Sequence, residues 1–154
     1  MRLAKKIALL LLVILIAIQF IQPARNKSGQ VLPTDILRTV PVSPAVRALL
    51  KTGCYDCHSN NTNYPWYANV QPIGWILNGH IQKGKAELNF SEFGSYTVRR
   101  QKSKMKSIES QVNDNGMPLA SYTWIHKNAR LSKENKVLII DWVTKTNEAI
   151  STKQ

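Results

Sequence analysis

The sequence predicts an all-α domain preceded by an N-terminal membrane-anchor helix. Three observations support this fold class. Residues 7–21 form an almost unbroken apolar run, apolar residues in later segments recur at helical spacing, and no stretch alternates apolar and polar residues over the length of a strand. At 154 residues the chain fits one domain. We therefore expect helices joined by long loops that are rich in aromatic residues.

Residues 1–22 are typical of a signal anchor or a signal peptide, because Arg2, Lys5 and Lys6 precede the apolar run. A helix of about 15 residues covers roughly 23 Å, which is short of a hydrocarbon core of roughly 30 Å, so its length leaves both alternatives open. Cleavage would need small residues after the run, and residues 20–23 are Phe, Ile, Gln and Pro. This favours an uncleaved anchor that places the rest of the chain outside the cytosol.

Residues 23–42 predict a linker, because they mix proline, glycine, serine and charged residues without periodicity. The domain is expected to follow over residues 43–150. Its first helix begins with Ser43 as N-cap and Pro44 in the first turn, and Gly53 ends it. The two cysteines of the chain therefore follow the end of a helix.

Three further helices are expected, over residues 72–84, 95–113 and 133–150. Gly84 is the expected stop of the first of these helices. The second has one apolar stripe that includes Met105, and Gly116 follows its end. The third is capped by Ser132 and has a broad apolar face, which must be well buried.

The chain is strongly basic, with a net charge of +12 from 21 basic and 9 acidic residues. Its surface should attract anions, whether acidic partner proteins, lipid head groups, nucleic acid or the carboxylates of a ligand, and charge alone does not choose among them. The stretch "RRQKSKMK", residues 99–106, holds five cations and no acid. Such a stretch is either a docking face or a solvated helix face. Nucleic acid is not an expected partner, because the domain should not meet the cytosol.

Cys54, Cys57 and His58 form the motif "CYDCH", and three chemistries use two cysteines at this spacing. A dithiol oxidoreductase places such a pair after a strand and at the start of a helix, whereas here a helix precedes the pair. A zinc site needs a second ligand pair, and His80 and His126 lie too far apart in sequence to form one. Haem c needs two thiols that reach one edge of the porphyrin and a histidine directly after them. The motif therefore predicts covalently attached haem, with His58 as an iron ligand.

The surroundings of the motif add two expectations. The second ring nitrogen of His58 should donate to a backbone carbonyl, and the loop over residues 65–72 is near enough in sequence to supply it. Aromatic residues on either side of the motif would suit a flat ligand as a set, although each one alone is more often a core or rim residue. These aromatic residues are Trp66, Tyr67, Trp75, Tyr122 and Trp124.

The opposite face of the iron has four candidate ligands, which are Met105, Met117, His80 and His126. Met105 lies on an apolar helical stripe, so it is expected to be a packed side chain. Met117 precedes Pro118, which disfavours helical backbone and should present the thioether from an extended loop. We favour Met117, and we keep His80, His126 and an open iron as alternatives. A sulfur ligand suits electron transfer, whereas an open face permits gas binding or peroxide chemistry.

The elements "CYDCHSN", "YPWY", "LNFS" and "MPL" together resemble the bacterial haem-binding domain family of cytochrome c relatives. The resemblance covers about residues 45–145. It implies a cytochrome c-like helical domain around one haem that is covalently attached at Cys54 and Cys57. It also implies His58 as an iron ligand and Met117 as the matching methionine. Members look like short periplasmic or membrane-anchored proteins.

The predicted function is that of a mono-haem c-type cytochrome domain that transfers single electrons. We expect it to be tethered to the bacterial inner membrane through its N-terminal helix, with the domain facing the periplasm. Such a protein is an electron carrier rather than an enzyme. The alternative is a haem enzyme of the peroxidase type or a gas sensor, in which the distal site is open and His80 or His126 acts as distal acid or base.

Overall fold

The computed structural model describes residues 2–152, and within them every regular element is a helix. Lys27 and Asn61 form an isolated bridge outside any strand. In chain order, the α-helices and the 3-10 helices (η) are α1 (Arg2–Ile18), α2 (Ile36–Thr39), α3 (Pro44–Gly53), α4 (Tyr55–His58), η1 (Trp66–Asn69), α5 (Ile73–Glu87), η2 (Phe90–Ser95), α6 (Val98–Asn113), α7 (Ala120–Ile125), η3 (Lys127–Ala129) and α8 (Lys133–Ser151). The predicted all-α class is confirmed.

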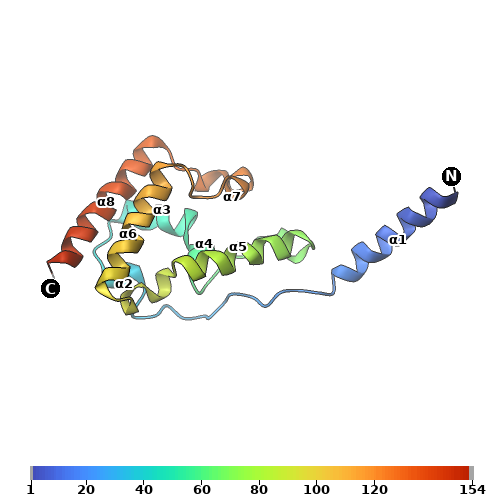
Figure 1. Ribbon diagram of the computed structural model, residues 1–154, viewed down its shortest axis with the longest axis horizontal. Coiled ribbons are helices and arrows are strands. Elements are labelled where there is room, and N and C mark those ends of the chain that lie inside the picture. The colour runs from blue at the N-terminus through green and yellow to red at the C-terminus, as the bar shows by residue number, and fades with distance from the viewer. Residues whose placement is uncertain (1, 153–154) are drawn as a thin grey trace.

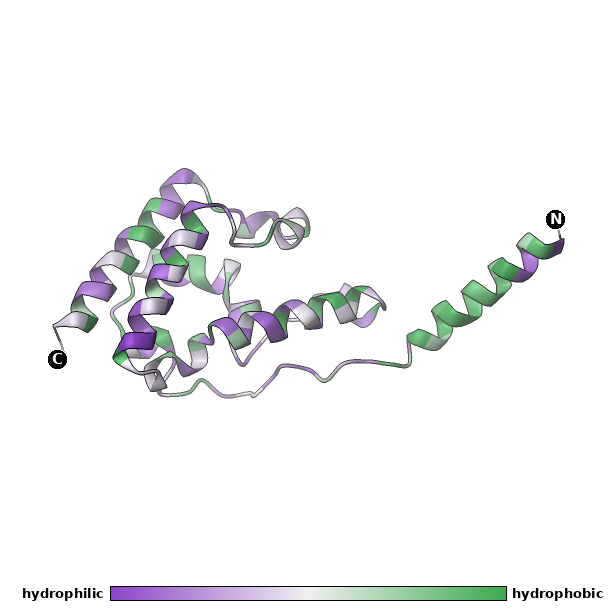
Figure 2. Cartoon of the chain, in the orientation of Figure 1, coloured by the Kyte–Doolittle hydropathy of each residue, from purple (hydrophilic) through white to green (hydrophobic). Residues whose placement is uncertain are grey.

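Helix α1 extends away from the other helices (Figure 1). It is apolar along most of its length, and none of its residues is buried (Figure 2). Within residues 2–152, no helix combines the length and the hydropathy that crossing a membrane would require. Met1, the first residue of the predicted segment 1–22, lies outside the described residues.

Helices α3 and α8 begin directly after the serines that the sequence predicts as their N-caps. The Ser43 hydroxyl accepts a hydrogen bond from the Val46 amide at 3.3 Å, and the Ser132 hydroxyl accepts one from the Asn135 amide at 3.2 Å. Each bond satisfies an amide that the first turn of a helix leaves free. Helix α3 ends at Gly53, as expected, and α4 follows after one residue, Cys54.

Helix α5 continues past its expected end at Gly84 and reaches Glu87. Gly84 has another role, because a Cβ atom there would lie 2.6 Å from the Cys57 carbonyl oxygen. This glycine therefore lets α5 approach α4 closely. Helix α6 begins a few residues later than expected, since Thr97 is its N-cap and accepts from the Arg100 amide at 3.3 Å.

The main core lies between α6, α8 and α3, and α6 and α8 pack side by side (Figure 1). Met105 is completely buried in it, which confirms that this methionine is a packed side chain. A smaller cluster lies along α5 and η1 and holds Tyr67, Ala68, Leu77 and Ile81. The buried members of the main core are Ile36, Leu37, Val46, Leu50, Tyr55, Leu88, Phe90, Phe93, Met105, Val112, Ile139, Trp142, Val143 and Ile150.

Part of the expected linker packs on the domain. Helix α2 lies within residues 23–42, and its Ile36 and Leu37 are buried in the main core. Asp35 caps α2 by accepting from the Leu37 amide at 2.9 Å, and it also accepts from the Tyr55 hydroxyl at 2.7 Å. A helix of four residues is too short to show helical periodicity in the sequence.

Candidate functional site

Helix α4 is one turn long and carries the "CYDCH" motif. Its first turn closes on Cys54, whose carbonyl accepts from the Cys57 amide at 3.2 Å and from the His58 amide at 2.9 Å. Residues three apart lie on the same side of a helical turn. The turn therefore brings the Cys54 and Cys57 side chains to one side of α4.

Two hollows lie beside α4, and together they gather the residues that the sequence predicts for the site. The first, about 280 Å³, is lined by Cys57 and the second, about 390 Å³, by Cys54. His58 and Met117 line both hollows, together with Gly53 and Glu87. Ligand sites in proteins measure about 300–1,000 Å³, so the two adjoining hollows have the size of a ligand site.

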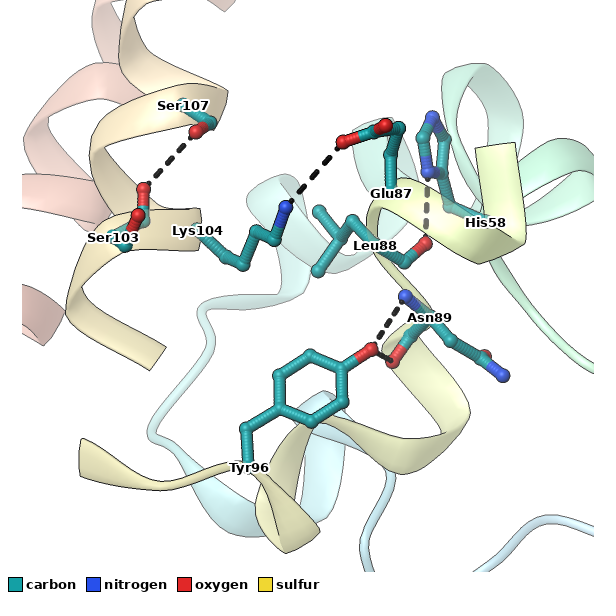
Figure 3. A network of polar contacts seen from close by, with 8 residues as sticks. All are labelled: His58, Glu87, Leu88, Asn89, Tyr96, Ser103, Lys104 and Ser107. Carbon is teal, nitrogen blue, oxygen red and sulfur yellow. Dashed lines mark hydrogen bonds and ion pairs between the residues drawn. The ribbon is translucent and has the colours of Figure 1, made fainter. Parts of the chain in front are cut away.

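One hydrogen bond fixes the tautomer of His58. Its Nδ1 lies 2.9 Å from the Leu88 carbonyl oxygen, and a carbonyl can only accept (Figure 3). Nδ1 therefore carries the proton and Nε2 keeps its lone pair. Figure 3 shows the second ring nitrogen pointing away from Leu88. Desolvation lowers the pKa of His58, which favours the neutral ring that binds metals.

The carbonyl that holds His58 was expected from residues 65–72, and that expectation is wrong. Helix α5 returns the chain to α4, so Leu88 at its end supplies the carbonyl. The next residue is fixed as well. The Asn89 amide donates to the Tyr96 hydroxyl at 2.9 Å (Figure 3), and the Asn89 side chain donates to the Asn60 side chain at 2.8 Å. These bonds orient the peptide segment on which the position of the imidazole depends.

The environment of the two thiols differs from that of a reactive dithiol. Desolvation and the neighbouring Cys57 raise the pKa of Cys54 to about 12. Desolvation and the charge of Asp56 raise the pKa of Cys57 to about 11. Both side chains are free thiols. A thiol oxidoreductase needs a lowered thiol pKa, so this environment counts against a redox pair.

A structural zinc site finds no donor set in the described part of the chain. No three histidine, cysteine or carboxylate residues among residues 2–152 come together in an arrangement that could hold a metal ion. A structural zinc site needs four such ligands.

Met117 lies in the bend between α6 and α7 and is half-buried. Its amide donates to the Gln111 carbonyl at 3.1 Å, which ties the bend to the last turns of α6. The thioether is thus presented by a loop that is anchored at its base, as expected from the position of Pro118.

The two remaining histidines differ in their surroundings. His80 lines the first hollow from α5, together with Cys57, His58 and Met117. His126 lies at the end of α7, where its Nε2 is 2.7 Å from the Tyr67 hydroxyl and its ring stacks on Tyr122 with 4.3 Å between centroids. His126 is thus engaged by its neighbours, and His80 is the histidine that adjoins the predicted ligands.

The aromatic residues that would suit a flat ligand as a set differ in their surroundings, and several are core or surface residues. Tyr122 lines the first hollow, but Trp66 and Trp124 are 79% and 76% exposed. Tyr67 is buried in the smaller cluster instead. Sequence reasoning missed Phe90, which lines the second hollow and whose ring centroid lies 5.8 Å from that of His58. Its only sequence signal is its place in the "LNFS" element.

Some charged residues line the hollows although the sequence analysis did not assign them to the site. Lys83 lines the first hollow and Lys104 the second. Lys104 forms an ion pair with Glu87 at 3.5 Å (Figure 3), and the Tyr122 hydroxyl donates to Asp56 at 2.8 Å. Lys104 belongs to the cationic stretch 99–106, whereas no pattern in the sequence marks Lys83.

The donor set fits an iron porphyrin. Two thiols stand on one side of a helical turn, a neutral imidazole keeps a lone pair on Nε2, and a thioether reaches the same hollows. The lysines beside these hollows suit the carboxylates of a propionate-bearing ligand.

A comparison with protein families gives one match. A family model described as a haem-binding domain matches residues 13–145, a range that includes α3 to α7 and the whole of the site. No curated protein and no solved structure matches the chain.

Proposed function

The chain belongs to the haem-binding domain family, and from that premise we propose that it is a mono-haem c-type cytochrome domain that transfers single electrons. The observation that carries the proposal is that His58 and Met117 line both of two adjoining hollows, of which Cys57 lines the first and Cys54 the second. Family membership supports haem binding, and these four residues specify how the haem would be held.

Each residue has a separate role in this proposal. Cys54 and Cys57 would hold haem c through thioether bonds, and His58 through Nε2 and Met117 through sulfur would bind its iron. Lys83 and Lys104, which line the hollows, would pair with the propionates. When bound, the haem iron supplies a one-electron ferric–ferrous couple. A sulfur ligand raises the potential of this couple and keeps small ligands from the iron, which suits an electron carrier.

The surface charge supports transfer to an acidic partner. The net charge of +12 attracts negatively charged proteins. The cations of residues 99–106 lie on α6, where Lys104 lines the second hollow and Arg99, Lys102 and Lys106 line a separate groove on the surface of the same helix. We expect redox proteins to dock there.

Location in the periplasm and tethering to the bacterial inner membrane through residues 1–22 belong to the same proposal. They rest on the basic residues before the apolar run and on the exposed apolar side chains of α1. Fractionation of expressing cells tests them: the full-length chain should sediment with membranes and be cleaved by protease added to spheroplasts. Recovery in the cytosolic fraction would contradict both.

Mass and visible spectra test the cofactor. When the chain is expressed with an intact cytochrome c maturation system, its mass should exceed that of its amino acids by one haem. Acid-acetone should not extract this haem. A Cys54→Ala/Cys57→Ala variant should lose the covalent haem. A wild-type chain without added mass would contradict the proposal.

The distal ligand is tested by Met117→Ala, with Met105→Leu as the matched control in the core. Met117→Ala should change the visible spectrum, lower the reduction potential and permit prompt binding of carbon monoxide to the reduced protein. Met105→Leu should leave all three unchanged, because that side chain is buried away from the hollows. An unchanged spectrum and potential in Met117→Ala would remove Met117 from the iron.

One observation favours a second function, a haem enzyme or sensor with an open distal face. His80 lines the same hollow as His58 and could act as distal acid or base. In that case the wild-type protein would bind carbon monoxide promptly and in stoichiometric amount. A His80→Ala variant would then lose peroxide reduction, whereas it should leave an electron carrier active.

A further inference from the structure

The domain exposes a group of large apolar side chains around the N-terminal half of α5. We call this surface the aromatic tip; it consists of Trp66, Val70, Ile73, Trp75, Ile76 and Trp124. Their exposed fractions range from 37% for Trp75 to 79% for Trp66. The hydrogen bond between Tyr67 and His126 joins η1 to the end of α7, so Trp66 and Trp124 belong to neighbouring elements. Apolar groups of this size on a surface indicate an interaction site.

Helix α1 is joined to the same tip. The Gln19 side chain accepts from the Gln71 amide at 2.9 Å and donates to the Gln71 carbonyl at 3.1 Å. The Trp75 indole donates to the Ile21 carbonyl at 2.8 Å. Figure 1 shows the end of α1 on the side of the domain toward which α5 and α7 project. These hydrogen bonds hold the end of the exposed apolar helix next to the exposed apolar tip.

The two segments of the chain that carry the tip hold charges of one sign. Residues 59–82 and 115–133, which include the whole tip, contain no aspartate and no glutamate. Exposed Lys127 follows α7, and the Arg25 guanidinium lies over the Tyr64 ring, 4.4 Å from its centroid. An anionic surface would attract these cations and would meet no acidic side chain in the two segments.

We propose that the aromatic tip docks on the headgroup region of an anionic lipid bilayer. Three of the four tryptophans of the chain lie in it, and indole rings favour this region because one part is apolar and the N–H is polar. Proximity to α1 and the absence of acids in the two segments favour a lipid surface over a protein partner. The inference rests on the proposed membrane association and adds that the domain itself touches lipid.

Docking by the tip orients the haem site. The tip uses the first turn of α5, whereas His80 and Lys83 line the first hollow from later turns of the same helix. At about 1.5 Å per residue, these positions lie about 6–15 Å farther along the helix than the tip. The hollow would then lie farther from the lipid than the tip but remain near it, within reach of a membrane-bound redox partner.

Quenching of tryptophan fluorescence by brominated lipid tests the docking surface. The full-length holoprotein is mixed with vesicles of phosphatidylcholine and phosphatidylglycerol. In one preparation the upper acyl carbons of the lipid are brominated, and in the other they are not. The tryptophan emission in the first preparation is divided by that in the second, because haem quenches both equally. We expect brominated lipid to remove about half of the emission, since the tip holds most of the tryptophans and the fourth, Trp142, is buried.

Two variants that keep every tryptophan sharpen the test. Ile73→Glu/Ile76→Glu places acids in the tip and should reduce the quenching at least about twofold. The control is Val137→Glu/Leu138→Glu, which changes two exposed residues of α8 and should be quenched like wild type. Wild-type emission that brominated lipid does not change, or an acidic tip variant quenched as strongly as wild type, would overturn the proposal.

Sedimentation and haem content of the same samples separate this inference from the proposed function. A chain that sediments with vesicles but is not quenched contradicts the docking surface alone. A chain that does not sediment contradicts both the tether and the docking surface. Quenched protein without covalent haem contradicts the cytochrome function and leaves the docking surface supported.

Discussion

The bond from His58 Nδ1 to the Leu88 carbonyl determines which nitrogen of that ring can bind a metal. Without a fixed acceptor on Nδ1, the proton could sit on either nitrogen, and the ring could turn. The acceptor lies thirty positions away in sequence and is a backbone atom. A backbone carbonyl can accept a hydrogen bond whatever the side chain of its residue, so the sequence does not identify Leu88 as the acceptor for His58.

Tyr55 gives a prediction about pH at the same scale. Its hydroxyl donates to the buried Asp35 at 2.7 Å. Desolvation, followed by this hydrogen bond, raises the pKa of Tyr55 well above its ordinary value of about 10. The folded state therefore favours the neutral form. This contribution to stability is fully present below pH of about 10 and is lost as the pH rises above it, because the unfolded chain then gives up the proton first.

We expect the free energy of unfolding of wild type to fall above pH 10 by about 1.4 kcal/mol per pH unit more than that of Tyr55→Phe. At pH 7 the variant should be about 1–3 kcal/mol less stable than wild type, because Asp35 loses a hydrogen bond while it stays buried. Urea unfolding at several pH values between 7 and 11 measures both effects. Parallel pH profiles for the two proteins would show that Tyr55 does not titrate in this way.

At the scale of elements, the close approach of α5 to α4 depends on Gly84. We expect Gly84→Ala to cost about 1–3 kcal/mol of stability, because its Cβ would lie 2.6 Å from the Cys57 carbonyl oxygen and must push the two helices apart. Haem bound per chain should fall as well, since α4 carries the cysteine and the histidine of the proposed haem site. Urea unfolding and the haem absorbance per chain measure the two effects.

Gly79 provides the matched control within the same helix. A Cβ atom at this position has nothing within 4 Å. Gly79→Ala should therefore stabilise the protein by up to about 1 kcal/mol through helix propensity and leave haem content unchanged. Equal effects of the two substitutions would mean that the contact between α4 and α5 does not limit the packing of the site.

Gly84 and the helix caps together show which features of a helix can be predicted from the sequence. Ser43 and Ser132 cap the helices that they were expected to cap, because capping involves only the first turn of the helix itself. Gly84 was expected to end α5 and instead lies within it, because its role depends on another element that approaches from outside. Local signals identify where helices begin, whereas the sequence of one helix does not show which other helix it contacts.

At the scale of the whole molecule, the distribution of charge gives a further prediction. Within the cationic stretch, Arg100 lies over the Tyr96 ring and Lys104 pairs with Glu87. We expect the anionic oxidant ferricyanide to react at least about twofold more slowly with the reduced holoprotein when the other three cations of the stretch become alanine. These three residues are Arg99, Lys102 and Lys106. Stopped-flow oxidation at low ionic strength measures the rate.

The control removes three charges from a different face of the molecule, on α8. Its residues are Lys133, Lys136 and Lys145. High salt should reduce the difference between the two triple variants, because exposed charges are screened over about 10 Å at 0.1 M ionic strength. Equal rates in the two variants would mean that net charge, and not the face formed by α6, determines the reaction with anions.

The sequence by itself determined the all-α class, the caps of α3 and α8 and the "CYDCH" motif as the candidate site, because each depends on neighbours within a few positions. It also singled out Met117 over Met105, since backbone preference and apolar periodicity are local properties. Only the tertiary structure decided that Leu88 orients His58, that Phe90 and two lysines line the hollows, and that the tryptophans form an exposed tip. These features depend on which helices pack together, and that packing joins residues far apart in the chain.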